Sequence, residues 1–426
     1  MGTLTTIALI ILFITFMTFV TFFGRLPALR NTPISFLHRL IWIHLPSFFT
    51  TLDNRLTSGR FSSSFTRLFN YLMNDRHPTI LIFFLLLLTI GEYLYLPTAW
   101  PQLSSPLTKT TAAISILLPY IFLYLSAFTD PGYITPQNHT SEMARYPYDF
   151  TLFHPGISCH TCFLLKPARS KHCSVCKRCI AKNDHHCIFI NNCVGANNHH
   201  YFLLLLLSTA ILTLYGGVLG IHLITKKMYL YFPQFNLLPW KANHGAGMTL
   251  TQWLVIWSWG LQDGVAMGAV TLLALLTSPL VWGLLGYHIW LVYCGTTTNE
   301  SMKWSDWQYE MREGFAYKRR MAKNRQKDLG VEPGWTRWPA ETEQIIVRTE
   351  SGNPPAEDDK ELAGVGPWEN VWALKDVENL YDLGFWDNLV DVFVPWYMFR
   401  DPKKVSLNGG GLKNRKKRRA RKIYLA

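Results

Sequence analysis

The sequence predicts an all-α integral membrane protein with about five transmembrane helices and a small zinc-stabilised cytosolic domain between spans 3 and 4. Three observations support this fold class. The chain of 426 residues is 49% hydrophobic, and its apolar residues are gathered into long runs. Seven of its eight cysteines lie in residues 159–193, at spacings typical of metal ligands. The net charge of +13 fits nucleic acid or an anionic membrane surface, and the apolar runs favour the membrane.

Five apolar runs are long enough to be transmembrane helices. The first, residues 7–23, could also be a signal peptide, but no Lys or Arg precedes it and no small-residue cleavage site stands out. We therefore expect residues 1–23 to form an uncleaved N-terminal membrane anchor helix. The other four spans are predicted at residues 79–96, 111–128, 201–224 and 266–293.

The segments around these spans give the expected order of domains. Residues 24–78 carry seven arginines against two aspartates, which predicts a cytosolic basic loop. A transmembrane hairpin at 79–129 leads into the cysteine-rich domain at 130–200. A second transmembrane hairpin with a lumenal loop follows at 201–294, and residues 295–426 form a cytosolic tail. An odd number of spans puts the short N-terminus in the lumen and the tail in the cytosol, where clustered cysteines stay reduced.

The cysteine-rich stretch holds enough ligands for two zinc ions. The pairs Cys159/Cys162 and Cys173/Cys176 have the two-residue gap that lets both thiolates reach one tetrahedral ion. Further ligands of suitable softness are Cys179, Cys193, His172 and His186. Two four-coordinate ions need eight ligands, so one of the seven cysteines is left over. From spacing alone, a purely structural zinc module is an equally good interpretation.

We expect the spare cysteine to be Cys187, because an acid and a base precede it directly. A free thiol has a pKa of about 8.5, and a neighbouring imidazole can lower it enough to supply thiolate at neutral pH. A carboxylate fixes the tautomer of that imidazole and stabilises its charged form. Asp184 would thus orient His185, His185 would act as the base and Cys187 as the nucleophile, while His186 binds zinc. On spacing alone, the alternative with Cys187 as a ligand and Cys193 as the spare stays open.

The run Asp-His-His-Cys at 184–187 lies in a frame that resembles the cysteine-rich domain of the DHHC protein acyltransferases. The sequence matches the pattern C-x2-C-x9-HC-x2-C-x2-C-x4-DHHC-x5-C throughout. Asp-Pro-Gly at 130–132 and Thr-Thr-Asn-Glu at 297–300 strengthen the resemblance, which covers roughly residues 79–300. Many spaced positions match, so the signal is far more specific than a lone pair of cysteines.

The resemblance implies a protein S-palmitoyltransferase. A long-chain acyl group would pass by a ping-pong reaction from palmitoyl-CoA to Cys187 and then to a cytosolic cysteine of a membrane protein. One structural zinc ion would be held by Cys159, Cys162, His172 and Cys179. The other would be held by Cys173, Cys176, His186 and Cys193. The alternative is a non-catalytic, membrane-anchored zinc-binding interaction module, which would have no need of Asp184 and His185 beside an unligated Cys187.

The resemblance also bears on substrates, location and the tail. Ile188 and Phe189 stand where the family usually has Pro-Trp, and both could line an acyl mouth. With the extra N-terminal span, this change is similar to the fungal spore-wall-formation subgroup. That subgroup implies the endoplasmic reticulum membrane and SNAREs among the substrates, with the lipid bilayer and no nucleic acid as partner. Basic residues of the stretch could meet the phosphates of acyl-CoA, although for any single one a basic cytosolic face near lipid is the better interpretation. They are Lys166, Arg169, Lys171, Lys177, Arg178 and Lys182.

Three segments after the last span remain to be interpreted. Two of them have two interpretations each, and the third is expected to contact the membrane. Residues 297–300 would brace the active domain or cap a helix end. Residues 379–388 resemble the aromatic motif that packs against the catalytic domain in this family, or form a surface helix on the lipid headgroups. Residues 413–422 are polybasic, and attraction to an anionic leaflet would contribute about 1 kcal/mol per basic residue.

Overall fold

The computed structural model describes residues 32–238, 248–322, 324–357 and 362–399, six scattered residues between 13 and 24, and the backbone of 421–422. The chain divides into two compact units. One consists of Met1–His77 and Phe232–Gln262, and the other of Pro78–Tyr231 and Asp263–Ala426. The predicted anchor helix at 1–23 and the polybasic run at 413–422 therefore lie almost wholly outside the described residues.

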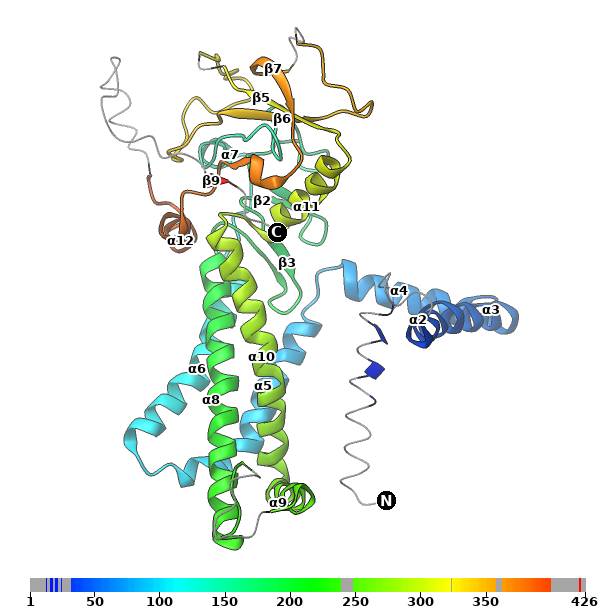
Figure 1. Ribbon diagram of the computed structural model, residues 1–426, viewed down its shortest axis with the longest axis vertical. Helices are drawn as coiled ribbons and strands as arrows, with labels where there is room; N and C mark the ends of the chain where they lie inside the picture. Colours follow the sequence, from blue (N-terminus) through cyan, green and yellow to red (C-terminus); the bar gives the residue numbers. More distant parts are fainter. Residues whose placement is uncertain are drawn as a thin grey trace. The chain divides into compact units, whose positions relative to one another are not determined.

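Four long apolar helices of the second unit match the predicted spans (Figure 1). They are α5 (Thr79–Ala99), α6 (Pro106–Phe128), α8 (His199–Tyr231) and α10 (Val265–Tyr293). Among the described residues, these four are long and apolar enough to cross a bilayer. The chain is therefore a multi-pass membrane protein.

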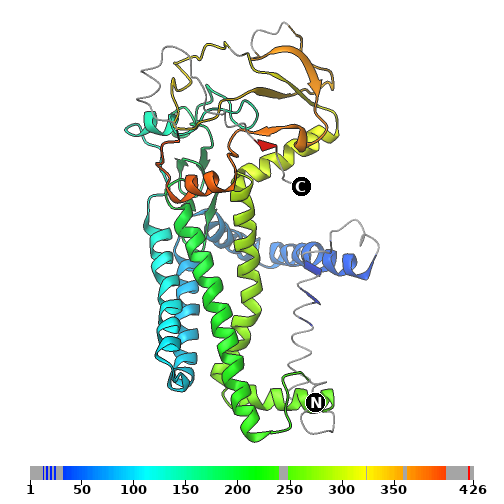
Figure 2. The ribbon, with the colours of Figure 1, turned by 60° about the vertical axis from the view of Figure 1, so that its left-hand side comes forward.

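The long helices α8 and α10 pack closely because glycines face the contact (Figure 2). A Cβ atom added at Gly220 would collide with Thr271, and one added at Gly217 would lie 2.7 Å from Leu275. Small residues at helix crossings let backbones approach in a bilayer, where no hydrophobic effect drives helices together. α8 also packs against α6, and α10 against α5, so α8 and α10 form the centre of the bundle.

The cysteine-rich segment between α6 and α8 forms loops and two short hairpins. The first pairs β1 (Lys171–Cys173) with β2 (Arg178–Ile180), and the second pairs β3 (His185–Cys187) with β4 (Asn192–Val194). Residues 143–153 pack on the tail, but the ligand loops at 159–182 have only a small apolar cluster, which consists of Ile134, Cys159, Cys179, Ala181 and Ala196. A segment with so little apolar core needs another source of folding free energy, and bound metal is a common one.

The tail contains a sheet that the sequence does not predict. β5 (Ala316–Arg320) lies between β6 (Gln344–Arg348) and β7 (Val365–Asn370) in an antiparallel sheet. The basic run Lys318–Arg320 hides the alternation expected of a strand. Arg319 is nevertheless buried, because its guanidinium donates to loop carbonyls of Ala363 and Glu357. The all-α expectation is therefore incomplete for the tail.

Two helices flank this sheet in the chain. α11 (Thr298–Arg312) follows α10 directly and leads into β5, while α12 (Phe385–Phe393) follows a short 3-10 helix at Leu374–Asp376 and β8 (Glu378–Asn379). β8 pairs with β9 (Arg421–Lys422). Met311, Ile346 and Val377 contribute to the apolar cluster between α11 and the sheet. The tail is thus folded onto the same unit as the cysteine-rich segment.

In the first unit, the predicted basic loop is largely helical. It contains α2 (Pro33–Arg39), a π-helical turn at Leu40–His44, α3 (Leu45–Thr57) and α4 (Arg60–Asn74). α3 and α4 are separated by Ser58 and Gly59, both with left-handed backbone. The carboxylate of Asp53 accepts a hydrogen bond from the N–H of Ser62 at 2.7 Å, which satisfies a free donor at the start of α4. The unit also contains α9 (Leu250–Gln262).

Candidate active site and metal centres

The first group of metal-ligating side chains converges on His172. Its Nδ1 atom lies 3.5 Å from the sulfur of Cys159, 3.4 Å from that of Cys162 and 3.8 Å from that of Cys179. Ligands bound to one tetrahedral zinc at bond lengths of about 2.0–2.3 Å are roughly 3.5 Å apart. The four donors therefore fit a zinc ion, and they are the set that the resemblance implies.

The second group has the same geometry. His186 Nδ1 lies 3.7 Å from the sulfur of Cys173, 3.4 Å from that of Cys176 and 3.6 Å from that of Cys193. The hairpins explain the pairing, because the register sets His186 opposite Cys193 in one and His172 opposite Cys179 in the other. Each histidine is thereby held against a cysteine of its own group.

Each Cys-x2-Cys pair forms the same turn. The N–H of Cys162 donates to the sulfur of Cys159 at 3.4 Å, and the N–H of Cys176 donates to the sulfur of Cys173 at 3.3 Å. The residue after each pair, Phe163 or Lys177, has a left-handed backbone with φ of 55°. This turn brings two sulfurs to one point and then redirects the chain.

The alternation of side chains along β3 separates the two histidines. In a strand, residues i and i+2 share a face and residue i+1 points to the other. His186 is directed to the second metal group, while His185 and Cys187 share the opposite face. His185 Nδ1 lies 2.6 Å from Asp184 Oδ2, a hydrogen-bond distance. Cys187 belongs to neither metal group.

The carboxylate of Asp184 is fully buried and held by the chain after α10. Its Oδ1 accepts a hydrogen bond from the N–H of Thr298 at 2.7 Å, and its Oδ2 accepts one from the Thr298 hydroxyl at 2.9 Å. The N–H of Asn299 donates to the Asp184 carbonyl at 3.1 Å. Residues 297–300 therefore brace the Asp184 loop.

The same four residues also cap α11. Thr297 and Glu300 form a reciprocal capping box at its start. Glu300 further accepts two hydrogen bonds from the Arg169 guanidinium, at 2.7 and 2.6 Å, with both side chains buried. Residues 297–300 therefore do both things expected of them: they brace the active domain and they cap a helix. The capped helix is α11, which follows α10.

The electrostatics of Asp184 and His185 favour a carboxylate beside an imidazolium. Burial alone would raise the pKa of Asp184, but the hydrogen bond from His185 and the nearby imidazoles outweigh it and lower that pKa below its usual range. Burial disfavours the charged form of His185, but its hydrogen bonds to Asp184 and Cys187 raise its pKa to about 10. An imidazolium beside a sulfur favours the thiolate, which is the nucleophilic form of cysteine.

Cys187 lies at the end of the helix bundle. It belongs to an apolar cluster with residues from three spans, which include Leu123, Phe202, Leu206 and Leu285. Ile188 and Phe189, next along the chain, are exposed, and the Phe189 ring contacts that of Phe84 on α5. The arrangement can direct a sulfur nucleophile at a long apolar chain entering between the helices.

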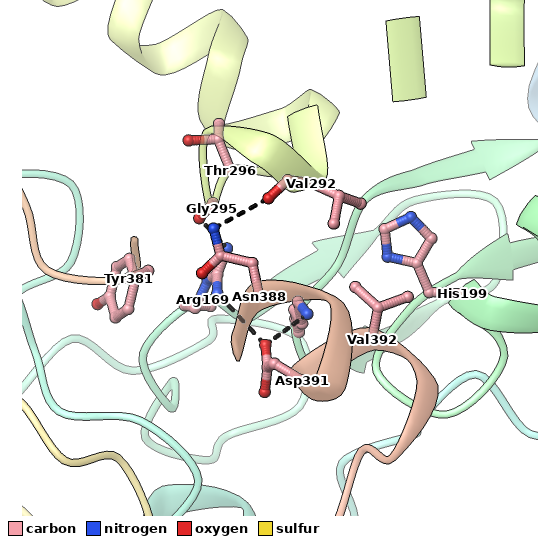
Figure 3. A pocket seen from close by; sticks show the side chains of 10 residues that line it. Arg169, His199, Val292, Gly295, Thr296, Tyr381, Asn388, Asp391 and Val392 are labelled. Atoms are coloured by element: carbon pink, nitrogen blue, oxygen red, sulfur yellow. Dashed lines mark hydrogen bonds and ion pairs between the residues drawn. The ribbon is translucent and has the colours of Figure 1, made fainter. Parts of the chain in front are cut away.

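Two buried histidines of the spans are not predicted as site residues from the pattern of the cysteine-rich stretch. His288 of α10 is 3% exposed, and its Nδ1 lies 4.0 Å from Asp184 Oδ2. Its ring lies against those of His185 and Phe202. His199 begins α8 and lines a small pocket with Arg169 (Figure 3). An ionisable residue inside an apolar run is itself a signal, which could have identified His288.

Asp184, His185 and His288 are close enough for a third metal group, but their spacing argues against one. The 2.6 Å between Asp184 and His185 fits a hydrogen bond. Two ligands of one tetrahedral ion are separated by more than about 3 Å. We interpret this cluster as a hydrogen-bonded acid–base pair with a second imidazole beside the carboxylate.

Two of the six basic residues suggested for acyl-CoA phosphates are unavailable. Arg169 is buried against Glu300, and Lys182 is buried against Asp391 of α12 at 2.6 Å. Their charges instead pair with carboxylates of the tail. Lys171, Lys177 and Arg178 are exposed, and Lys166 is partly so.

The aromatic tail segment at 379–388 packs onto the catalytic unit. The Asn379 side chain donates to the Cys294 carbonyl at 2.9 Å, and that of Asn388 donates to the Val292 carbonyl at 3.0 Å (Figure 3). Both carbonyls belong to the end of α10, where the helix leaves them without intrahelical partners. The buried ring of Tyr381 faces the Arg169 guanidinium, while Trp386 is 75% exposed.

Comparisons with known proteins agree with these features. The family model described as DHHC palmitoyltransferase matches residues 153–305 of this chain. The chain is 68% identical to palmitoyltransferase SWF1 of Neurospora crassa, over 95% of both chains. It is 43% identical to palmitoyltransferase swf1 of Emericella nidulans, over 92% of this chain and 97% of that one. It is 34% identical to palmitoyltransferase swf1 of Schizosaccharomyces pombe, over 88% and 92%.

Proposed function

Because this chain belongs to the DHHC palmitoyltransferase family and is a protein S-palmitoyltransferase, we propose that its acyl group is carried on Cys187. The observation that carries the proposal is that consecutive side chains of β3 point to different sites, His186 to a metal group and His185 and Cys187 away from it. Eight donors form two metal groups, and the cysteine outside them lies two residues after an imidazole bonded to a buried carboxylate.

The first step is attack of the Cys187 sulfur on the thioester carbonyl of palmitoyl-CoA. His185 holds the proton from the thiol and returns it to the sulfur of CoA, which leaves as the C–S bond to Cys187 forms. In the second step, a substrate cysteine attacks the acyl-Cys187 thioester, and His185 takes and returns a proton in the same way. Thioester exchange is nearly balanced in energy, so orientation and thiolate formation supply the catalysis.

The two metal groups would hold zinc ions with structural roles. Each offers four protein donors, which leaves no position for water or substrate on the ion. Structural zinc supplies roughly 10–16 kcal/mol of folding free energy in small domains. Here it would substitute for the apolar core that the ligand loops at 159–182 lack.

The position of Cys187 at the end of the spans supports the class of substrate, and the similarity to fungal SWF1 palmitoyltransferases supports the location. Cysteines beside the transmembrane segments of other membrane proteins would reach it, and SNAREs are the class we favour. We place the enzyme in the endoplasmic reticulum membrane with the cysteine-rich domain in the cytosol. The sequons at Asn138 and Asn299 would then stay unmodified. Glycosylation of either one in cells would rule out this orientation.

Labelling with palmitoyl-CoA tests the nucleophile. The purified full-length protein is incubated with alkynyl palmitoyl-CoA, alongside Cys187→Ser and the control Cys294→Ser. Cys294 is buried at the end of α10 and belongs to neither metal group. We expect hydroxylamine-sensitive label on the native protein and on Cys294→Ser, and none on Cys187→Ser. Equal labelling of Cys187→Ser would assign the nucleophile elsewhere, and a folded protein that takes no label would favour the interaction module.

A further inference from the structure

α3 and α4 each present an apolar face that the described residues leave uncovered. On α4, Phe61, Phe65 and Phe69 recur at the spacing that puts them on one side of a helix, and they are 74%, 63% and 53% exposed. On α3, Phe49 and Leu56 recur in the same way and are also exposed. No apolar cluster found among the described residues includes a side chain of either helix.

The opposite faces are polar, and the charge of the segment is positive. On α4, Ser63, Arg67 and Asn70 lie on the side away from the three phenylalanines, at 100° per residue. Within α2 to α4 the basic side chains are Arg39, Arg55, Arg60 and Arg67. The one acidic residue there, Asp53, already accepts hydrogen bonds from Thr57 and Ser62.

Neither helix has the length of a span. α3 has 13 residues and α4 has 15, whereas a helix that crosses the hydrocarbon core needs about 20 apolar residues. A short helix with an apolar face, a polar face and arginines is typical of segments that lie in the membrane interface. Isolated helices of this length are marginal in water, so a surface that covers the apolar face would also stabilise them.

The chain itself holds α4 near the bilayer. α4 ends at Asn74 and the transmembrane helix α5 begins at Thr79. Four intervening residues reach at most about 18 Å when fully extended. The end of α4 therefore stays within reach of the headgroup layer, whatever the arrangement of the rest of the first unit.

We propose that α3 and α4 form an interfacial anchor on an anionic lipid surface. Their phenylalanines and leucines would lie among the upper acyl chains, and their arginines would meet lipid phosphates and carboxylates. Charge complementarity and the short tether to α5 favour lipid over a protein partner for this face. The inference concerns attachment of the first unit and does not depend on the role of Cys187.

Hydrogen–deuterium exchange of the full-length protein in nanodiscs tests this anchor. The discs contain either phosphatidylcholine alone or phosphatidylcholine with about a third phosphatidylserine. We compare the native chain with the triple variant Phe61→Ser, Phe65→Ser, Phe69→Ser. The matched control replaces the opposite face by Ser63→Ala, Thr66→Ala and Asn70→Ala. Serine and phenylalanine have similar helix propensities, so the phenylalanine variant changes the apolar face with little effect on intrinsic helix stability.

We expect amides of α4 in anionic discs to exchange at least tenfold faster in the phenylalanine variant than in the native and control chains. Arg60→Gln with Arg67→Gln should reduce the difference between the two lipid compositions. Unchanged protection of α8 and α10 verifies that each variant is folded. Equal protection of native and phenylalanine-variant α4 would overturn the proposal. So would protection that appears only in discs holding two copies, since the face would then contact a second chain.

Discussion

His185, His186 and Cys187 are consecutive in β3, and strand alternation sends them to different environments. The division between base, metal ligand and spare cysteine can be predicted from the spacing and the family frame. The reason for it cannot, because a three-residue strand has no visible signature in a sequence of cysteines and polar residues. The motif at 297–300 can be predicted to brace this domain, but the sequence does not show that Thr298 bonds Asp184 from 114 positions away. His288 stands out as an ionisable residue in an apolar run, but the sequence does not show that it lies beside Asp184.

The hydroxyl group of Thr298 should contribute more to the acylation rate than the volume of the side chain does. Thr298→Val removes the hydrogen bond to Asp184 Oδ2 and keeps the backbone one to Oδ1. Outer partners of this kind are typically worth 10–100-fold. We expect the rate constant of acyl-enzyme formation to fall about tenfold, measured by rapid quench with palmitoyl-CoA. Thr298→Ser keeps the hydroxyl and should recover the native rate; a Ser variant as slow as Val would refute the hydrogen-bond explanation.

His288 should contribute to the same step through Asp184. His288→Phe fills the space but removes the nitrogen that lies 4.0 Å from the carboxylate. We expect a fall of about tenfold in the acylation rate constant, because the carboxylate loses a polar neighbour in a dry site. His288→Asn keeps a polar atom near the Nδ1 position and should be milder. Tyr287→Phe, on the exposed side of α10, is the control, and an equal loss there would remove the argument.

At the scale of elements, α12 is held by a buried carboxylate shared among several cations. Asp391 pairs with Lys182 at 2.6 Å and with Arg337, and accepts a hydrogen bond from the Tyr146 hydroxyl at 2.8 Å. These partners come from the cysteine-rich segment and from the tail, so one side chain connects both. The sequence leaves two interpretations of the aromatic segment open, packing on the catalytic domain or lying on the headgroups, and it does not single out Asp391.

Replacing Asp391 should release α12 and destabilise the unit. Asp391→Asn leaves buried cations without their partner, which typically costs about 3–5 kcal/mol. Burial opposes the charge of Asp391, but Lys182 and Arg337 outweigh it and hold its pKa below the usual range. This contribution is therefore present above about pH 4 and is lost as the pH falls further.

Proteolysis of the tail provides the measurement. At pH 7, Asp391→Asn should be cleaved near α12 much faster than the native chain, and urea unfolding should shift in the same sense. The difference between the two chains should shrink as the pH falls below about 4, because the unfolded state then binds a proton at Asp391 that the folded state, with its lowered pKa, does not bind until the pH is lower still. Asp387→Asn changes a half-buried carboxylate of the same helix and serves as the control. Equal cleavage of Asp391→Asn and native protein at pH 7 would contradict the proposed role.

At the scale of the whole molecule, long apolar runs are easy to predict and short strands are not. The four described spans agree with the hydropathy of the sequence, because each is long and almost uncharged. The three-stranded sheet of the tail is not predicted, because its strands have five or six residues and the central strand contains a buried arginine. Burial of a charge requires loop carbonyls that no local pattern reveals.

Removing the metal should unfold the cysteine-rich segment while leaving the spans intact. A strong chelator at neutral pH should abolish acyl-enzyme formation and expose the ligand loops at 159–182 to rapid amide exchange, because few apolar contacts remain to hold them. α8 and α10 should stay protected. Readdition of zinc should restore both properties. A chelated protein with native exchange in this segment would show that the metals are dispensable for the fold.

The two groups of ligands are interleaved along the chain, with Cys173 and Cys176 of the second lying between His172 and Cys179 of the first. Closing one loop orders residues that belong to the other, so occupancy of one site should raise the affinity of the other. A population of these molecules exposed to limiting zinc would divide into fully loaded and empty chains. Activity plotted against free zinc would rise with a Hill coefficient near 2, the upper limit for two coupled sites.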